Sequence, residues 1–232
     1  PDVNTLLKNA DAAMYRAKSQ GRNTFQFFTA EMNELANERL STEQSLRRAI
    51  ERKELLLLYQ PRVNLRTGRV DGVEALVRWQ HPERGLIVPD RFIPLAEETG
   101  LIVPIGEWVL RNACEQAARW RAAGHSLVVS VNLSARQLWA GGFARLVADV
   151  LAEHGMAEHL ELELTESMVM HDAENVIETL QALKALGVRL SVDDFGTGYS
   201  SLSYLRRLPL TALKIDGSFV RDISATGASD DG

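Results

Sequence analysis

The stretch that decides the fold is Val188-Arg189-Leu190-Ser191-Val192-Asp193-Asp194-Phe195-Gly196-Thr197-Gly198-Tyr199. It begins as an apolar, partly β-branched run, which predicts a buried strand over residues 188–192. The run stops at two adjacent carboxylates and passes into a loop that contains two glycines. Because ionised carboxylates are costly to bring together and to bury, they are normally paired with cations or with metal. The pair indicates a functional site, although a solvated aspartate pair that opens a turn is the alternative for these two residues alone.

Composition restricts the class of protein. The chain has 232 residues, of which 45% are hydrophobic and 25% charged, as in a globular protein with ample material for a core. Its net charge of -5 argues against a basic surface that holds DNA. No apolar run approaches the roughly 20 residues that cross a membrane, and the N-terminus does not resemble a secretory signal. The single Cys114 excludes an internal disulfide, so we expect a cytoplasmic protein, with a membrane tether upstream left open.

The N-terminal segment reads as part of another domain. Residues 1–18 carry apolar side chains at helical spacing, and Gly21 supplies a helix stop before a short strand expected at 24–28. A helix and a strand cannot form a core, so we expect the tail of a domain whose body lies upstream. The polar helical pattern over 31–53, with a helix start at Ser41-Thr42-Glu43-Gln44, predicts a connecting helix that enters the main domain.

Strand-like and helix-like segments then alternate. Strands are expected at 55–63, 69–79, 127–133, 160–164, 188–192 and 212–215, and helices at 90–99, 106–123, 135–154, 173–186 and 200–208. Such β-α repeats predict an α/β fold, for which a TIM-like barrel and an open doubly wound sheet compete. The first two strands are joined by residues 64–68 alone, which is too short for a crossover helix, so they should form an antiparallel hairpin.

Polar side chains lie at the predicted strand ends. They are Gln60, Glu74, Arg78, Asn132, Glu163, Glu166, Asp193, Asp194, Lys214 and Asp216. Singly, each has a structural explanation: Glu163 as a solvent-facing alternate, Asn132 as a helix N-cap, Lys214 as an exposed edge lysine. Together they indicate a site, because parallel strands of a barrel deliver their carboxyl ends to one face.

The chemistry of this set favours hard metal ions. Its oxygen donors, without histidine or thiolate, suit Mg²⁺ or Mn²⁺, and the five histidines are interpreted as bystanders. Carboxylates numerous enough to share two ions suggest two-metal hydrolysis at phosphorus, with Asp193 as the bridging candidate. Asp194 can join only if the backbone turns there, because consecutive strand residues face opposite sides. Lys214 would hold a water or a phosphate oxygen, and a Schiff-base role is the rival hypothesis.

Five motifs resemble the EAL domain of cyclic di-GMP phosphodiesterases, in the family's order, from about Ser41 to about Asp222. They are Glu74-Ala75-Leu76-Val77-Arg78-Trp79, Asn132-Leu133-Ser134, Glu163-Leu164-Thr165-Glu166, Asp193-Asp194-Phe195-Gly196-Thr197-Gly198-Tyr199-Ser200-Ser201 and Lys214-Ile215-Asp216. The resemblance implies a TIM-like (β/α) barrel with an antiparallel first strand. It also implies metal-dependent hydrolysis of cyclic di-GMP to linear pGpG in bacterial second-messenger signalling.

The resemblance assigns roles to the polar residues. It implies metal ligands at Glu74, Asn132, Glu163 and Asp193, with Asp194 at the second metal or its water, and two Mg²⁺ or Mn²⁺ as cofactors. Lys214 would assist the water, Glu166 would anchor the loop 195–201, and Gln60, Arg78 and Asp216 would bind the dinucleotide. The family also implies a homodimer for the parent protein.

The two ends of the chain carry further expectations. Ala10-Asp11-Ala12-Ala13-Met14-Tyr15-Arg16-Ala17-Lys18, followed by Gly21-Arg22-Asn23, resembles the C-terminal end of GGDEF (diguanylate cyclase) domains. We therefore expect a GGDEF tail over 1–28, a connecting helix over 29–40 and an EAL domain over 41–232, with sensory domains upstream. Because the family continues through two more strands with a further glutamate and glutamine, we expect a truncated barrel that lacks turnover by itself. The alternative function is a non-catalytic EAL module that binds cyclic di-GMP or a protein partner.

Overall fold

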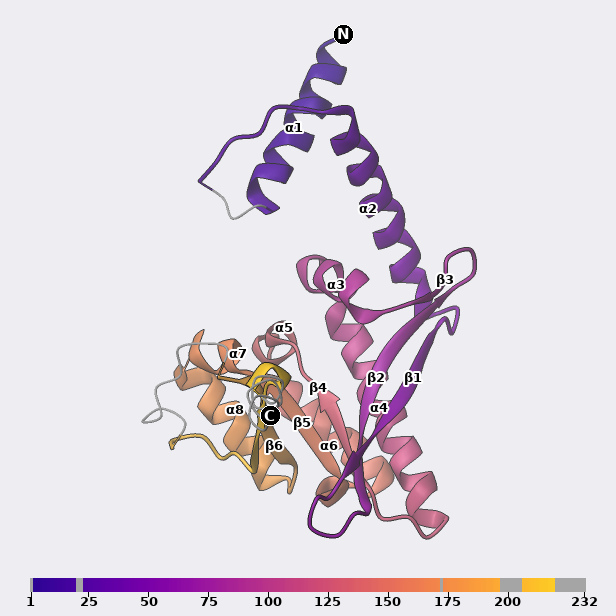
Figure 1. Ribbon diagram of the computed structural model, residues 1–232, viewed down its shortest axis with the longest axis vertical. Coiled ribbons are helices and arrows are strands. Elements are labelled where there is room, and N and C mark those ends of the chain that lie inside the picture. The colour runs from indigo at the N-terminus through magenta and orange to yellow at the C-terminus, as the bar shows by residue number, and fades with distance from the viewer. Residues whose placement is uncertain (1, 20–22, 172, 197–205, 220–232) are drawn as a thin grey trace, which may run out of the picture.

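One mixed sheet organises the chain in the computed structural model, which describes residues 2–19, 23–171, 173–196 and 206–219. Its strands lie side by side in the order β1 (Leu55–Val63), β2 (Val70–His81), β4 (Val128–Asn132), β5 (Leu160–Thr165), β6 (Arg189–Phe195) and β7 (Ala212–Ile215), with β3 (Gly85–Ile87) paired to β2 (Figure 1). β1 runs antiparallel to β2, and the remaining neighbours from β2 to β7 are parallel. The predicted antiparallel first strand is confirmed.

The two faces of the sheet differ in chemistry. Along β5 the residues read Leu160-Glu161-Leu162-Glu163-Leu164, all of them buried, so that leucines and glutamates point to opposite faces. The leucines belong to the hydrophobic core, which also contains residues of α4 (Ile102–Ala122), α6 (Phe143–His154) and α8 (Ala173–Ala185). The opposite face carries the charged side chains.

The helices that follow the strands form one layer. α4 contacts α6, and α6 contacts α8, while α4 also packs on β4 and α8 on β6. Helices of a doubly wound sheet would be divided between its two faces, whereas those of a barrel cover the outer face alone. The α/β prediction is confirmed, and the arrangement is that of a barrel wall. Among the described residues β1 and β7 form the edges of the sheet.

Two helical regions differ from the sequence-based prediction. Residues 135–154 form two helices, α5 (Ala135–Trp139) and α6, because Gly141 and Gly142 between them both adopt positive φ. Residues 90–99 form a 3-10 turn, η1 (Pro89–Arg91), followed by α3 (Ile93–Thr99), which has Pro94 in its first turn. Proline suits that position, because its missing N–H has no intrahelical partner there.

The N-terminal segment consists of α1 (Val3–Ser19) and α2 (Ala30–Ala49), which project from one end of the sheet (Figure 1). The strand expected at 24–28 is wrong: these residues form no regular element, because no strand of the described chain pairs with them. The helix start expected at Ser41 is also wrong. α2 runs through it unbroken, and Thr42 Oγ1 donates to the Glu38 carbonyl one turn earlier, at 2.8 Å.

Three short elements were not predicted: β3, the 3-10 turn η2 (Ala157–His159) and α7 (Glu166–His171). In the turn between β2 and β3, His81 Nδ1 accepts hydrogen bonds from the backbone N–H groups of Glu83 and Arg84, so this histidine has a structural role. Most of the helix expected at 200–208 lies outside the described residues. No helix in the described part of the chain is long and apolar enough to cross a membrane.

Candidate active site

Lys214, on β7, lies at the centre of three carboxylates. Its ammonium nitrogen donates to Glu163 Oε2 at 2.6 Å, to Asp193 Oδ2 at 2.9 Å and to Glu74 Oε2 at 3.4 Å. These four residues come from four strands, β7, β5, β6 and β2. The predicted convergence of strand ends is therefore present, and Lys214 is not the exposed edge lysine that was the alternative.

Asn132 extends the cluster. Its side-chain amide donates to Glu74 Oε1 at 2.8 Å. The helix N-cap here is Ser134 and not Asn132, because the Ser134 hydroxyl accepts from the Arg136 N–H and forms a capping box with Gln137. The N-cap alternative for Asn132 is therefore wrong, and its side chain is free to serve the site.

Glu74 lies inside β2, within the strand predicted over 69–79, and not at its carboxyl end. β2 continues to His81, beyond the end of its pairing with β4, and pairs there with β1 and β3. Gln60 pairs with Glu74 across the β1–β2 ladder, so the two side chains share a face. Arg78 lies four residues further along the same face, where its guanidinium donates to the Val77 carbonyl at 2.8 Å.

The Asp193-Asp194 pair lies inside β6, because the strand extends to Phe195 and not to Val192 as predicted. Asp194 has a φ of 54°, and the pairing of β6 with β7 is irregular between Val192 and Phe195. The backbone thus turns at Asp194 itself, which is the condition for both carboxylates to serve one site. The Asp194 N–H also donates to Asp193 Oδ1 at 2.9 Å and fixes that carboxylate.

Glu166 and Asp216 each bind backbone near the cluster. Buried Glu166, the first residue of α7, accepts from the Gly196 N–H at 3.0 Å and so holds the start of the loop that follows β6. Residues 197–201 of that loop lie outside the described residues. Asp216 Oδ1 accepts from the Ser218 N–H at 2.9 Å and so forms an Asx turn after β7.

Burial, hydrogen bonds and neighbouring charges shift the pKa values of three groups at the site. Burial raises the pKa of Glu163, and Lys214 opposes that rise. Burial lowers the pKa of Lys214, but its hydrogen bonds to Glu163 and Asp193 and the charge of Glu74 outweigh burial, so the net shift is upward. Burial, then the charges of Asp193 and Asp216, raise the pKa of Asp194. Lys214 is therefore a cation at neutral pH, which disfavours the Schiff-base role, since that role needs a neutral amine.

The donor chemistry fits divalent cations. Within the described residues no group of three or more His, Cys, Asp or Glu side chains is arranged to hold a metal ion. The ammonium of Lys214 lies between Glu163, Asp193 and Glu74, so a cation already bridges the carboxylates. Carboxylate and amide oxygens converging on one positive charge are a ligand set that Mg²⁺ or Mn²⁺ can use.

A second polar cluster, not predicted from the sequence, lies on the same face of the sheet. Arg62 donates to buried Glu161 at 3.0 Å and to Ser130 at 3.3 Å, and the Ser191 hydroxyl donates to Glu161 at 3.0 Å. Glu161 precedes Glu163 by two residues on β5, so this cluster lies nearer the start of the strand than the Lys214 cluster does. The alternation of leucine and glutamate in β5 was the available signal, because it places both glutamates on one face.

Comparison with known proteins identifies the family. The protein-family model described as "EAL domain" matches residues 43–230 of the sequence. The chain belongs to the EAL domain family. This EAL domain is 52% identical over 221 residues to the bifunctional diguanylate cyclase/cyclic di-GMP phosphodiesterase MucR of Pseudomonas aeruginosa, an alignment that covers 94% of the chain and 32% of MucR. It is 47% identical over 223 residues to the cyclic di-GMP phosphodiesterase PdeR of Escherichia coli, with 96% and 34% covered. The chain thus spans about a third of each of these relatives.

Solved structures agree with the sequence relationship. The structure described as "PaMucR Phosphodiesterase, c-di-GMP complex" shares 50% identity and a TM-score of 0.76, over 79% of this chain and 75% of that one. The FimX EAL domain from Pseudomonas aeruginosa bound to c-di-GMP shares 26% identity and a TM-score of 0.73, over 80% and 75%. The predicted family and its TIM-like barrel fold are confirmed.

Proposed function

We propose that the protein containing this chain hydrolyses cyclic di-GMP to linear pGpG. The observation that carries the proposal is the convergence of Glu74, Glu163 and Asp193, from strands β2, β5 and β6 of an EAL domain, on one cation. Half of the aligned residues are identical to those of a phosphodiesterase whose structure is described as a cyclic di-GMP complex, which supports the choice of substrate.

The residues that would hold two Mg²⁺ or Mn²⁺ ions are Glu74, Asn132, Glu163, Asp193 and Asp194. When bound, two such ions supply an activated water and neutralise charge on the phosphoryl group. Asn132 orients Glu74 through its amide, and the left-handed turn at Asp194 brings a second β6 carboxylate to the same side. Lys214, protonated and held by Glu163, donates a hydrogen bond to a water or a phosphate oxygen.

The remaining roles follow the geometry of the strands. Gln60 and Arg78 lie on the site face of β1 and β2, and we assign them to the dinucleotide together with Asp216 after β7. Glu166 anchors the loop after β6 through the Gly196 N–H. These contacts fix the substrate and the loop and transfer no proton.

The domain assignment extends the proposal to the N-terminal segment. The alignment with MucR covers 94% of the chain and so reaches beyond residues 43–230, and MucR is named a diguanylate cyclase as well as a phosphodiesterase. This supports a GGDEF tail over 1–28 and a connecting helix over 29–40 before the EAL domain. The homodimer, the upstream sensory domains and the cytoplasmic location stay predictions from the family resemblance.

Hydrolysis by the full-length protein tests the function. Purified protein is incubated with cyclic di-GMP and Mg²⁺ or Mn²⁺, and products are separated by chromatography. We expect pGpG from the wild type, none in excess EDTA, and none from Glu74→Ala, which removes a proposed metal ligand. Glu153→Ala is the matched control, because Glu153 is an exposed α6 residue paired with Arg111 away from the site. Unchanged turnover in Glu74→Ala would overturn the site assignment.

A non-catalytic EAL module is the second candidate function. It is favoured by the Lys214 ammonium between the carboxylates, together with the lack of a metal-holding group among the described residues. In that case the full-length protein binds cyclic di-GMP in calorimetry but forms no pGpG at any Mn²⁺ concentration.

A further inference from the structure

The backbone that follows Asn132 is held by polar contacts from two neighbouring elements. The Leu133 N–H donates to the Glu163 carbonyl of β5 at 2.8 Å. The Ser134 hydroxyl donates to Glu97 Oε1 at 2.7 Å, and Glu97 belongs to α3. Ser134 itself is buried, so this hydrogen bond is shielded from water. Glu97 was not among the residues that the sequence singled out.

A second set of contacts ties the last turn of α3 to the first turn of α5. The Arg136 guanidinium donates to the backbone carbonyls of Glu97 and Glu98, the latter at 3.0 Å. The Glu97 carbonyl also accepts from the Gly100 N–H, so the guanidinium adds a second hydrogen bond there. At Glu98 it binds a carbonyl of the helix C-terminus, where intrahelical partners are lacking. Side-chain and backbone contacts therefore join α3 to the segment that starts two residues after Asn132.

We propose that Glu97 is a positioning residue for Asn132, acting through Ser134. Glu98, through its contacts with α1 and α2, connects these two helices to the same turn of α3. Asn132 is the exposed last residue of β4, so the direction of its side chain depends on the backbone that follows. Its amide donates to Glu74, so a displaced Asn132 also releases Glu74. The role in hydrolysis rests on the proposed function.

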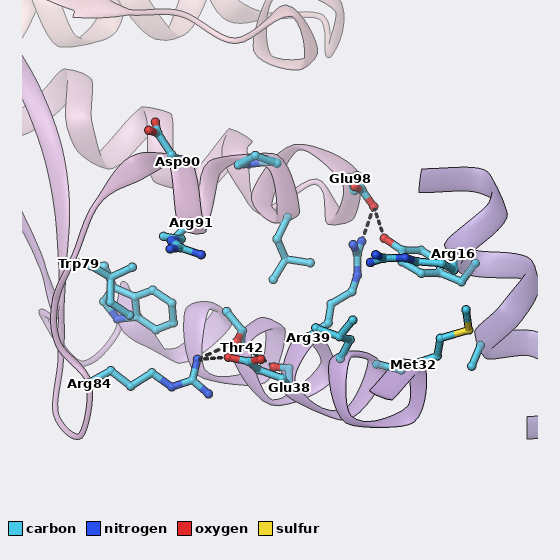
Figure 2. Close-up of a pocket in the computed structure, with 17 residues that line it drawn as sticks. Arg16, Met32, Glu38, Arg39, Thr42, Trp79, Arg84, Asp90, Arg91 and Glu98 are labelled. Atoms are coloured by element: carbon cyan, nitrogen blue, oxygen red, sulfur yellow. Dashed lines mark hydrogen bonds and ion pairs between the residues drawn. The ribbon is translucent and has the colours of Figure 1, made fainter. Parts of the chain in front are cut away.

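The contact with the N-terminal helices is made by the carboxylate of Glu98. Arg39 of α2 forms an ion pair with it, and the Tyr15 hydroxyl of α1 donates to it at 3.3 Å. The Arg39 guanidinium also lies 4.5 Å from the centre of the Tyr15 ring. Figure 2 shows the Arg39 side chain directed at Glu98. Both residues line a cavity of about 600 Å³ whose lining comes largely from α1, α2 and α3.

Glu97 and Glu98 are adjacent, and Arg136 holds the carbonyls of both. A movement of α1 and α2 that shifts Glu98 therefore shifts Glu97 and the Ser134 hydroxyl bound to it. Interactions with side chains that orient metal ligands typically change metal affinity by about 10–100-fold when they are removed. The same range is expected here, because Asn132 and Glu74 are both proposed ligands.

The test separates a hydrogen bond from a charge at position 97. Glu97→Leu removes the acceptor and the charge, whereas Glu97→Gln keeps an acceptor oxygen for Ser134 and removes the charge alone. Glu153→Leu is the matched control, because it removes an ion-paired carboxylate on α6. In the full chain we measure the Mn²⁺ dissociation constant by calorimetry and the side-chain amide resonances of Asn132 by NMR.

We expect Glu97→Leu to raise the Mn²⁺ dissociation constant by about 10-fold or more and to shift the Asn132 amide resonances. Glu97→Gln and Glu153→Leu should stay close to the wild type in both measurements. Equal losses in Glu97→Leu and Glu97→Gln would overturn positioning through Ser134 and indicate a charge effect. Failure of the wild type to bind Mn²⁺ would also overturn it. If the Mn²⁺ affinities change as expected but the full-length protein forms no pGpG, the proposed hydrolysis is refuted and the positioning role of Glu97 is not.

Three further variants test the two steps of the proposal separately. If Glu97→Leu does not fold, Ser134→Ala should reproduce the loss of Mn²⁺ affinity and Ser134→Thr, which keeps the hydroxyl, should restore it. Glu98→Gln breaks the ion pair with Arg39 and should shift the Asn132 amide resonances in the same direction as Glu97→Leu, by a smaller amount. Unchanged resonances in Glu98→Gln would overturn the connection to α1 and α2.

Discussion

Replacing Lys214 by methionine removes the positive charge that lies between three carboxylates and keeps a side chain of similar length. The ammonium is 2.6 Å from Glu163, 2.9 Å from Asp193 and 3.4 Å from Glu74. Removing one partner of a buried ion pair costs about 3–5 kcal/mol, because the other charge is left uncompensated. The Glu163 side chain is 1% exposed, but those of Lys214, Asp193 and Glu74 are 28%, 24% and 27% exposed. Because water screens those charges in part, we expect Lys214→Met to lower the free energy of unfolding by about 2–3 kcal/mol near neutral pH.

The loss should depend on pH in a defined direction. Burial raises the pKa of Glu163, and Lys214 opposes this, so the pKa rises further in the methionine variant. A carboxyl whose pKa is higher in the folded than in the unfolded state binds a proton preferentially when folded. Its contribution to stability is therefore present at low pH and is lost as pH rises from about 4.3 through the folded pKa. In the Lys214→Met variant this pH range extends to higher pH. The loss in its free energy of unfolding relative to wild type should therefore be smaller at about pH 5.5 than at about pH 8.

Urea unfolding followed by circular dichroism, in EDTA, measures both effects. Lys8→Met, at an exposed residue of α1, is the control and should change the free energy of unfolding by less than about 0.5 kcal/mol at either pH. A Lys214→Met deficit that is the same at both pH values would refute the reasoning about Glu163. A deficit no larger than that of Lys8→Met would refute the ion-pair cluster itself.

Three other predictions concern single residues. Asp194→Asn should raise the urea midpoint of unfolding slightly at neutral pH but not near pH 4. The reasons are that burial and neighbouring charges raise the pKa of Asp194, and that asparagine tolerates its positive φ. A lower midpoint at neutral pH would contradict this prediction. Burial raises the pKa of Cys114 to about 12. Cys114 should therefore react with a thiol reagent near pH 8 in urea but not in the folded protein. Equal reaction rates in the two states would show that the thiol is accessible in the folded protein. Gly106→Ala should lower the free energy of unfolding by about 1–2 kcal/mol, because a Cβ there would lie 1.9 Å from the Gln137 amide nitrogen and displace the side chain that caps Ser134. A more stable Gly106→Ala would mean that Gln137 moves without cost.

The fold followed from local patterns that tertiary packing did not override. The alternation of strand-like and helix-like segments and the short connection between β1 and β2 were enough to place the main strands and the hairpin. The errors lie where a local signal is ambiguous without its surroundings. Ser41-Thr42 looks like a helix start, yet α2 passes through it, because the same residues are acceptable inside a helix when the hydroxyl bonds to the preceding turn. A strand at 24–28 needs a partner, and the sequence pattern alone does not reveal whether one exists.

The site was predictable as a set of strand ends but not as a geometry. The sequence showed carboxylates in or directly after four strands, and parallel topology brings such residues to one face. It did not show that Asp194 adopts positive φ, because aspartate tolerates that conformation without requiring it. Nor did it show Glu97 or Arg62, since each acts through a contact with a residue distant in the sequence.

The most direct test of the central claim is the location of Mn²⁺ in crystals of this EAL domain, determined by anomalous scattering at the manganese edge. We predict manganese peaks within coordination distance of Glu74, Asn132, Glu163 and Asp193, with Lys214 displaced from the centre of the carboxylates. Manganese bound elsewhere, or crystals in saturating Mn²⁺ in which the Lys214 ammonium still bridges Glu163 and Asp193, would contradict the assignment of these strand ends as a metal-dependent active site.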